Sequence, residues 1–203
     1  DVCSSDLKKI NETKLLIYIC EGEEEEIKEW FKTINITGIP LNEQELLNAI
    51  YSGEFVTKAR ETFSNSFNSK MQKWYWFVSG TPKRQDYLRT ALDWVSHGKI
   101  SEYMSLHRHD TEITELETYF DTVIDWAGSI FGGGNPDTQR VEWGRLYESY
   151  HKNSYNPTEV RKRLDELYED FYVKNKVGIY EYLLGGESNK SLLNIRIFDV
   201  PTK

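Results

Sequence analysis

The densest group of side chains able to do chemistry is the run His-Arg-His-Asp at residues 107–110. Two imidazoles and a carboxylate can ligate zinc or a similar metal ion. Helical residues two apart point about 200° apart, so His107 and His109 reach one ion only if the helix ends there. We predict that both are structural or part of an interface, and that Asp110 caps the next helix. A metal or catalytic role is the alternative, and it needs further ligands from elsewhere in the chain.

Two basic segments are further candidates for contact with a phosphate. Arg84 and Gln85 begin the face of a predicted helix, where Arg84 can reach a phosphate or serve as a surface or interface residue. Residues 161–163 (Arg-Lys-Arg) precede four carboxylates, which favours pairing within the helix over contact with a DNA backbone. Arg84, Gln85, His107, His109 and Asp110 are therefore the polar site that the sequence predicts.

No catalytic motif is recognisable in the sequence. Walker A, G-x-G-x-x-G, H-E-x-x-H, G-x-S-x-G and C-x-x-C patterns are all missing. The glycine run at residues 132–134 lacks the Lys and Ser/Thr of a phosphate loop and follows no predicted strand, so we interpret it as a flexible linker. We assign no catalytic residue and no metal ligand, and expect no cofactor in this segment.

Composition narrows the class of protein. Aromatic residues make up 14% of the 203 residues, enough to fill a sizeable core. The net charge of −8 argues against general coating of nucleic acid, although a local basic face stays possible. Cys3 and Cys20 form no disulfide framework and suit a reducing compartment. With no apolar run of about 20 residues, we expect a cytoplasmic protein with no membrane partner.

The hydrophobic pattern predicts a mainly α protein. Leu15–Cys20 has the continuous apolarity of a buried strand, and a second strand is expected over residues 192–198. Between them, apolar spacing of three and four residues predicts roughly eight helices. These cover residues 23–34, 42–52, 55–63, 82–95, 100–107, 111–131, 143–150 and 157–171, while 71–78 is ambiguous between helix and strand.

Local signals place several helix ends. Asn42 and Glu45 have the spacing of a capping box, with residues 46, 47 and 50 (Leu, Leu, Ile) facing inward and Gly53 ending that helix. Thr81 and Pro82 predict another helix start, as do Asn156 and Pro157. That last helix should bury residues 160, 164, 167 and 171 (Val, Leu, Leu, Phe).

The segment from Ile27 to Gly53 resembles a known family. It fits the signature F-x-x-I-N-x-x-G-x-P-L-x-x-x-E-L, which closes the N-terminal domain of the GmrSD-like (GmrS/ParB-like) family. The matching residues are Phe31, Asn35, Gly38, Pro40, Leu41, Glu45 and Leu46. Segments 84–88, 107–110, 178–183 and 193–196 resemble the branch in which an HNH nuclease domain follows.

This resemblance implies a ParB-like domain with a D-G-Q-Q-R motif and nucleotide-dependent DNA cleavage in restriction or phage defence. The D-G-Q-Q-R motif is missing here and is expected upstream of Leu15, while the HNH motif is expected beyond Lys203. The chain would then be the central positioning segment of a DNA endonuclease. The other parts of that protein would contact DNA and use a nucleotide and a divalent metal. The alternative is a non-enzymatic helical module that binds a protein partner.

The expected organisation has four parts. Residues 1–7 resemble a translated sequencing-adapter tail, with a natural terminus as the alternative. Residues 8–53 are the terminal strand and helix of a truncated α/β, ParB-like domain, and residues 54–190 form a multi-helix domain with a flexible break near 132–140. Residues 191–203 are a strand-like linker toward the HNH domain. No oligomeric state is predicted.

Overall fold

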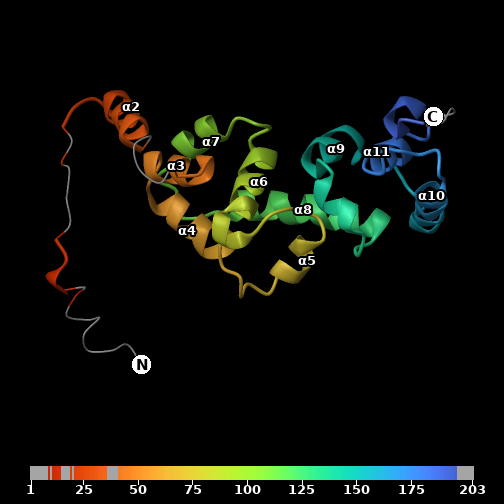
Figure 1. The fold of residues 1–203 in the computed structure, drawn as a ribbon, viewed down its shortest axis with the longest axis horizontal. Coiled ribbons are helices and arrows are strands. Elements are labelled where there is room, and N and C mark those ends of the chain that lie inside the picture. The colour runs from red at the N-terminus through yellow and green to blue at the C-terminus, as the bar shows by residue number, and fades with distance from the viewer. Residues whose placement is uncertain (1–8, 10, 15–18, 20, 36–40, 196–203) are drawn as a thin grey trace, which may run out of the picture. The chain divides into compact units, whose positions relative to one another are not determined.

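The computed structural model describes residues 9, 11–14, 19, 21–35 and 41–195. The chain divides into two compact units, residues 1–41 and 42–203 (Figure 1). The predicted boundary after Gly53 therefore differs from the observed division, which comes before Asn42. Residues 42–53 pack with the helical unit.

The first unit contains helix α2 (Glu24–Asn35), which confirms the helix predicted there. Its side chains Ile27 and Phe31 are half-buried, and Trp30 is 37% exposed. The predicted strand at residues 15–20 lies outside the described residues except for Ile19, which is exposed and in no strand. The predicted turn at residues 36–40 also lies outside the described part of the chain.

The second unit is helical, which confirms the mainly α class. Its α-helices are α3 (Glu43–Ile50), α4 (Glu54–Phe63), α5 (Met71–Tyr75), α6 (Asp86–Val95), α7 (Ile100–Leu106), α8 (Thr114–Phe131), α9 (Trp143–Tyr150), α10 (Pro157–Glu169) and α11 (Gly178–Leu184). Three short 3-10 helices are η1 (Pro82–Arg84), η2 (Pro136–Arg140) and η3 (Lys190–Leu193). No strand occurs among the residues that the structure describes.

The core is built on α8, the longest helix, which packs against α6, α9 and α10. Aromatic rings fill the space between helices. Trp74 stacks on Phe63 at 5.2 Å, and both meet the edge of Phe120 on α8. Farther along, Trp143 packs between the rings of Phe131 and Tyr180, both in contact with it. Such pairs add about 0.5–1.5 kcal/mol each beyond the area that they bury.

Two predicted helix starts are confirmed in detail. The Asn42 side chain accepts the Glu45 amide at 2.8 Å, and the Glu45 carboxylate accepts the Asn42 amide at 2.9 Å, which is a complete capping box. Asn156 accepts the Thr158 amide at 3.1 Å, with Pro157 in the first turn of α10. Both devices depend on residues within three positions of each other, so the sequence alone defines them.

The burial predicted for α3 is confirmed in part, since Leu47 packs against the core. Its buried side chains are polar, Gln44 at 2% and Asn48 at 7% exposure, whereas Leu46, Leu47 and Ile50 are half-buried. The Gln44 amide donates to Asn48 and the Asn48 amide donates to Gln85, while the buried Gln44 side-chain oxygen has no hydrogen-bond partner among the described residues. The helix also ends at Ile50, before Gly53, with Tyr51 as its C-cap.

Gly53 instead precedes α4, where a Cβ would lie 2.3 Å from the carbonyl oxygen of Arg108. The backbone of the turn after α7 therefore approaches α4 too closely for any side chain at this position.

Other differences occur where the chain turns. The helix expected from Pro82 is interrupted, because Gln85 adopts a left-handed conformation (φ 65°) between η1 and α6. Phe171 lies beyond α10 and is 66% exposed, since Asp170 begins a turn by accepting the Tyr172 amide at 2.8 Å. The ambiguous segment 71–78 is helical only as far as Tyr75.

The second predicted strand is wrong over its described part. Residues 190–193 form η3, begun by Asn189, whose side chain accepts the Ser191 amide at 3.2 Å. Leu193 is buried, and Asn194 turns the chain with φ 45°. The residues from 196 onward lie outside the described part of the chain.

The glycine-rich break between α8 and α9 is packed against its neighbours. Thr138 in η2 is buried, and its hydroxyl donates to the Trp76 carbonyl. Arg161 of α10 donates to the carbonyls of residues 128–130 at the end of α8, at 2.9–3.3 Å. Arg161 thus joins α10 to the end of α8. The sequence had predicted that it would pair with a carboxylate of its own helix. None of the described helices has the length and apolarity needed to cross a membrane.

Candidate functional site

The predicted His-Arg-His-Asp site is a tight turn after α7. His107 is the C-cap residue of α7, and its Nδ1 lies 2.7 Å from a carboxylate oxygen of Asp110. The imidazole also packs on the Tyr103 ring at 4.1 Å. Asp110 therefore pairs with His107, and the prediction that it caps the next helix is wrong. Helix α8 begins only at Thr114, after Ile113, and no side chain caps it.

Arg108 and His109 are the other two residues of this turn. His109 is exposed, and the Arg108 guanidinium donates to the Ser52 carbonyl at 2.9 Å. Within the described part of the chain, no three His, Cys, Asp or Glu side chains gather as metal ligands. In the structure this turn, which follows α7 in the chain, packs against the start of α4.

Arg84 and Gln85 are directed to different surroundings. Arg84 is exposed, and its carbonyl accepts the Asn42 side-chain amide at 3.2 Å. Gln85 is buried, and its Oε1 accepts the Asn48 amide at 2.5 Å. The Asn48 Oδ1 in turn accepts the Gln44 amide at 2.8 Å. Gln85 is thus part of a buried amide chain that joins α3 to the start of α6, and no described contact links it to His107.

The residues of the family signature separate between the two units. Phe31 is half-buried in α2, Asn35 is its last residue, and Leu41 is 38% exposed. Glu45 completes the capping box of α3 and Leu46 is half-buried. Gly38 and Pro40 lie outside the described residues.

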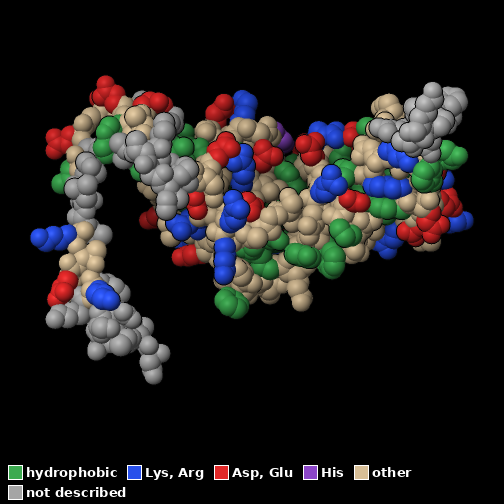
Figure 2. All heavy atoms as spheres, in the orientation of Figure 1, with side chains coloured by type: hydrophobic (Ala, Val, Ile, Leu, Met, Phe, Trp, Pro, Cys, Tyr) green, Lys and Arg blue, Asp and Glu red, His purple; other side chains and the backbone are tan. Residues whose placement is uncertain are grey.

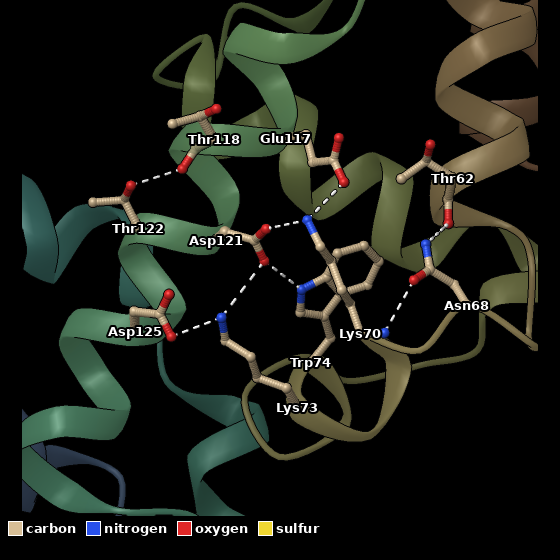
Figure 3. Close-up of polar contacts among 10 residues, drawn as sticks. All are labelled: Thr62, Asn68, Lys70, Lys73, Trp74, Glu117, Thr118, Asp121, Thr122 and Asp125. Carbon is tan, nitrogen blue, oxygen red and sulfur yellow. Dashed lines mark hydrogen bonds and ion pairs between the residues drawn. The ribbon is translucent and has the colours of Figure 1, made fainter.

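A cluster of ion pairs that sequence reasoning missed joins α5 to α8 (Figure 3). Three carboxylates lie four residues apart on one face of α8: Glu117, Asp121 and Asp125. Asp121 accepts the Trp74 indole N–H at 2.8 Å and lies 2.6 Å from Lys70 Nζ, while Lys73 reaches Asp125 at 2.6 Å. The hydrogen bonds to Asp121 and then Glu117 raise the pKa of Lys70, so this lysine stays a charged donor. The cluster is suited to stabilising the packing of α5 on α8.

The second feature that the sequence did not reveal is a groove between α6 and α9. Trp94, Phe77 and Val78 form much of its apolar lining, and its volume is about 480 Å³. Polar side chains in its lining come from three places along the chain: Arg89 and Asp93 of α6, Gln139 and Arg140 of η2, and Glu142 and Arg145 at the start of α9. A second hollow of about 330 Å³ shares Asp93, Trp94 and Arg145 with it and extends to His97 and Glu148.

Arg145 is firmly held within the groove. Its guanidinium donates two hydrogen bonds to Glu181, at 3.0 and 2.6 Å, and a third to Glu142 at 3.1 Å. The hydrogen bond from Arg145 lowers the pKa of the Glu181 carboxyl, and the same bond raises the pKa of Arg145. Such a two-pronged pair fixes the guanidinium in one orientation.

The other two arginines of the rim are held less firmly. Arg89 pairs with Glu43 at 2.5 Å, and Arg140 pairs with Asp137 at 3.3 Å; the arginine side chains are 44% and 72% exposed. Exposed pairs of this kind contribute about 0–1 kcal/mol. The groove left no signal in the sequence, because its lining residues come from separate segments of the chain.

Comparison with known proteins found no similar protein. No family model matches the chain, and neither a curated protein nor a solved structure matches it. The resemblance to the GmrSD-like family therefore stays a prediction.

Proposed function

We propose that the chain is the central part of a cytoplasmic DNA endonuclease of the restriction or phage-defence type. In this proposal, residues 42–195 hold parts of a larger protein at a fixed separation, and those parts supply the cleavage chemistry. The signature residues between Phe31 and Leu46 support the family. A nucleotide and a divalent metal belong to the proposed parent protein.

One observation supports the positioning role: α3, which carries the last signature residues, is tied to the helical unit by buried amides. The Gln44, Asn48 and Gln85 side chains form a continuous chain of hydrogen bonds. Removing one buried partner leaves the other unsatisfied, at about 1–3 kcal/mol. Such a connection stabilises one orientation of α3 against α6. The Glu43–Arg89 ion pair joins the same two helices.

The test uses the complete protein that contains this chain, incubated with plasmid DNA, Mg²⁺ and nucleoside triphosphates. We expect cleavage by the wild type and weaker cleavage by Gln85→Ala, because α3 loses its buried anchor. Gln72→Ala removes an exposed amide of the same size and should cleave like the wild type. A complete protein that leaves DNA intact would refute the nuclease role. Wild-type cleavage by a folded Gln85→Ala protein would refute the positioning role.

A second candidate function is a helical module that binds another protein. The observation in its favour is the exposed pair Phe171 and Tyr172, at 66% and 54% exposure, beside Lys174. Large exposed aromatic side chains are enriched at protein interfaces. The flanking gene separates the two functions, because the nuclease proposal requires a D-G-Q-Q-R motif upstream of this chain.

A further inference from the structure

The smaller of the two hollows beside α6 and α9 lies where these helices come into close contact. A Cβ on Gly144 of α9 would lie 2.5 Å from Cδ1 of Trp94 on α6, so a larger residue would clash there. Asp93 of α6 and Glu148 of α9 are among the other lining residues, and the volume is about 330 Å³. That volume is at the small end of the range of about 300–1,000 Å³ for ligand sites. The hollow is therefore suited to a group of amino-acid size.

Trp94 brings an unpaired hydrogen-bond donor to this hollow. Its side chain is only 8% exposed, yet the indole N–H donates to no acceptor within the described part of the chain. The nitrogen Nε1 is bonded to Cδ1, the atom that meets Gly144, and both residues line the hollow. Nε1 is not sealed inside the protein, as the unpaired Trp126 nitrogen is, so a molecule in the hollow can reach it. This edge of the ring can thus donate to an oxygen of a bound molecule.

Two carboxylates of the hollow have no cationic partner among the described residues. Asp93 is exposed and takes part in no described ion pair, and Glu148 accepts the hydroxyl of Tyr119 at 2.5 Å. Burial raises the pKa of Tyr119, so this phenol stays neutral. The Arg145 guanidinium is already held by Glu181 and a second carboxylate. Figure 2 shows Asp and Glu side chains at the surface over α6 and α9, interspersed with Lys and Arg. The lining of the hollow therefore has an excess of negative charge.

We propose that this hollow binds an arginine or lysine residue in the peptide chain of a partner protein. The cationic end lies against Asp93 and Glu148, and a main-chain carbonyl of the bound residue accepts the Trp94 N–H. A metal ion or a polyamine would satisfy the carboxylates but has no acceptor for the indole. A free amino acid adds a carboxylate, for which the hollow has no unpaired cation because Arg145 is engaged. The inference goes beyond the nuclease proposal and does not depend on it.

The experiment titrates the isotope-labelled full chain with Nα-acetyl-L-arginine amide and follows the indole N–H signals by NMR. Trp94→Phe identifies the Trp94 signal among the six tryptophans, because that signal disappears. We expect it to shift with a Kd of about 1 mM, as for a ligand of about 15 non-hydrogen atoms. The matched probe is Nα-acetyl-L-citrulline amide, in which a neutral urea replaces the guanidinium. It should bind at least about tenfold more weakly.

Two variants remove the charges and preserve the fold. Asp93→Asn breaks no described side-chain contact, and Glu148→Gln keeps an oxygen for the Tyr119 hydroxyl. Each should weaken binding of the arginine probe at least about fivefold. The control Asp165→Asn removes an exposed carboxylate of α10 outside the hollow and should bind like the wild type. A cooperative thermal transition establishes that each variant is folded.

Several outcomes would overturn the inference. They are an unmoved Trp94 signal in the folded wild-type chain, equal affinity for the citrulline probe, or wild-type affinity in both charge variants. Tighter binding of free L-arginine than of the blocked residue would refute a peptide as the source. Binding of Nα-acetyl-L-lysine amide in a parallel arm would support the inference, since the contacts use a cation and a carbonyl oxygen. DNA cleavage by the complete protein is measured separately, so a failed titration leaves the nuclease proposal standing.

Discussion

Removing the carboxylate of Asp121 tests whether the α5–α8 cluster stabilises the fold. Asp121 is the shared acceptor of this cluster, with its side chain 19% exposed. One oxygen accepts the Trp74 indole N–H at 2.8 Å, and the other pairs with Lys70 at 2.6 Å. Asp125 carries the same charge one turn along α8, but its side chain is 67% exposed and it pairs with Lys73 alone. The two aspartates therefore form a matched comparison of one half-buried acceptor with one exposed partner.

The structure gives the size of the effect. Asp121→Ala leaves the Trp74 N–H, part-buried on a fully buried ring, without its acceptor, which costs about 1–3 kcal/mol, and it removes the Lys70 pair. Lys70 keeps Glu117 at 2.7 Å, so we expect a total loss of about 2–3 kcal/mol. Asp121→Asn keeps an oxygen for Trp74 and should lose about 1 kcal/mol. Asp125→Ala should lose no more than about 0.5 kcal/mol.

Urea unfolding followed by tryptophan fluorescence measures these differences. A loss of 2–3 kcal/mol corresponds to a lower melting temperature by about 4–12 °C in a chain of this size. The pKa of Lys70 is raised above its ordinary value of 10.5, so its contribution is complete below that pH and is lost as pH rises through the folded-state pKa. Asp121→Ala should show a smaller alkaline loss, because only Glu117 still raises the pKa of Lys70 in that variant. If Asp125→Ala destabilised the protein as much as Asp121→Ala, the reasoning would be refuted.

Three further predictions test other parts of the unit. Burial raises the pKa of Tyr168 to about 12, so its stabilisation is complete below the unfolded-state pKa of about 10 and is lost as pH rises. Wild type should lose about 1.4 kcal/mol more than Tyr168→Phe between about pH 8 and 11 in urea titrations, and equal losses would contradict this. The pKa of Glu181 is lowered by Arg145, so this contribution is present above the ordinary carboxyl pKa and disappears as pH falls through the folded-state value. Arg145→Met should flatten the acid limb of the stability curve; an unchanged limb argues against the pair. In α9, Gly144→Ala places a methyl 2.5 Å from a buried indole ring and should destabilise by about 1–3 kcal/mol. Gly128→Ala in α8 meets only a ring atom at 3.4 Å and should be neutral or stabilising in the same melting assay.

The sequence by itself determined the features whose partners lie within a few residues. The capping box at Asn42 and Glu45 and the start of α10 at Asn156 form as predicted, because each is closed by hydrogen bonds between a side chain and a backbone amide two or three residues away. Helix α9 has the predicted bounds, and the apolar face of α8 is buried as its spacing indicates. These signals also placed the protein in the mainly α class.

Only the tertiary structure decided where polar side chains find distant partners. Asp110 has the sequence context of a helix cap yet pairs backward with His107, and Gln85 of a predicted surface face is buried against Asn48. Phe171 likewise was expected to be buried, but the turn at Asp170 redirects the chain and leaves it exposed. A local pattern indicates on which face of a helix a residue lies. It does not say which other element packs against that face.

The groove shows the same division between sequence and structure. Arg89, Arg140 and Arg145 come from three elements whose local sequences give no reason to converge. Packing of α6 and η2 around α9 brings them to one rim, and η2 is held there by hydrogen bonds to the carbonyls of Tyr75 and Trp76. Because those contacts span more than 60 residues of chain, no spacing in the sequence contained them.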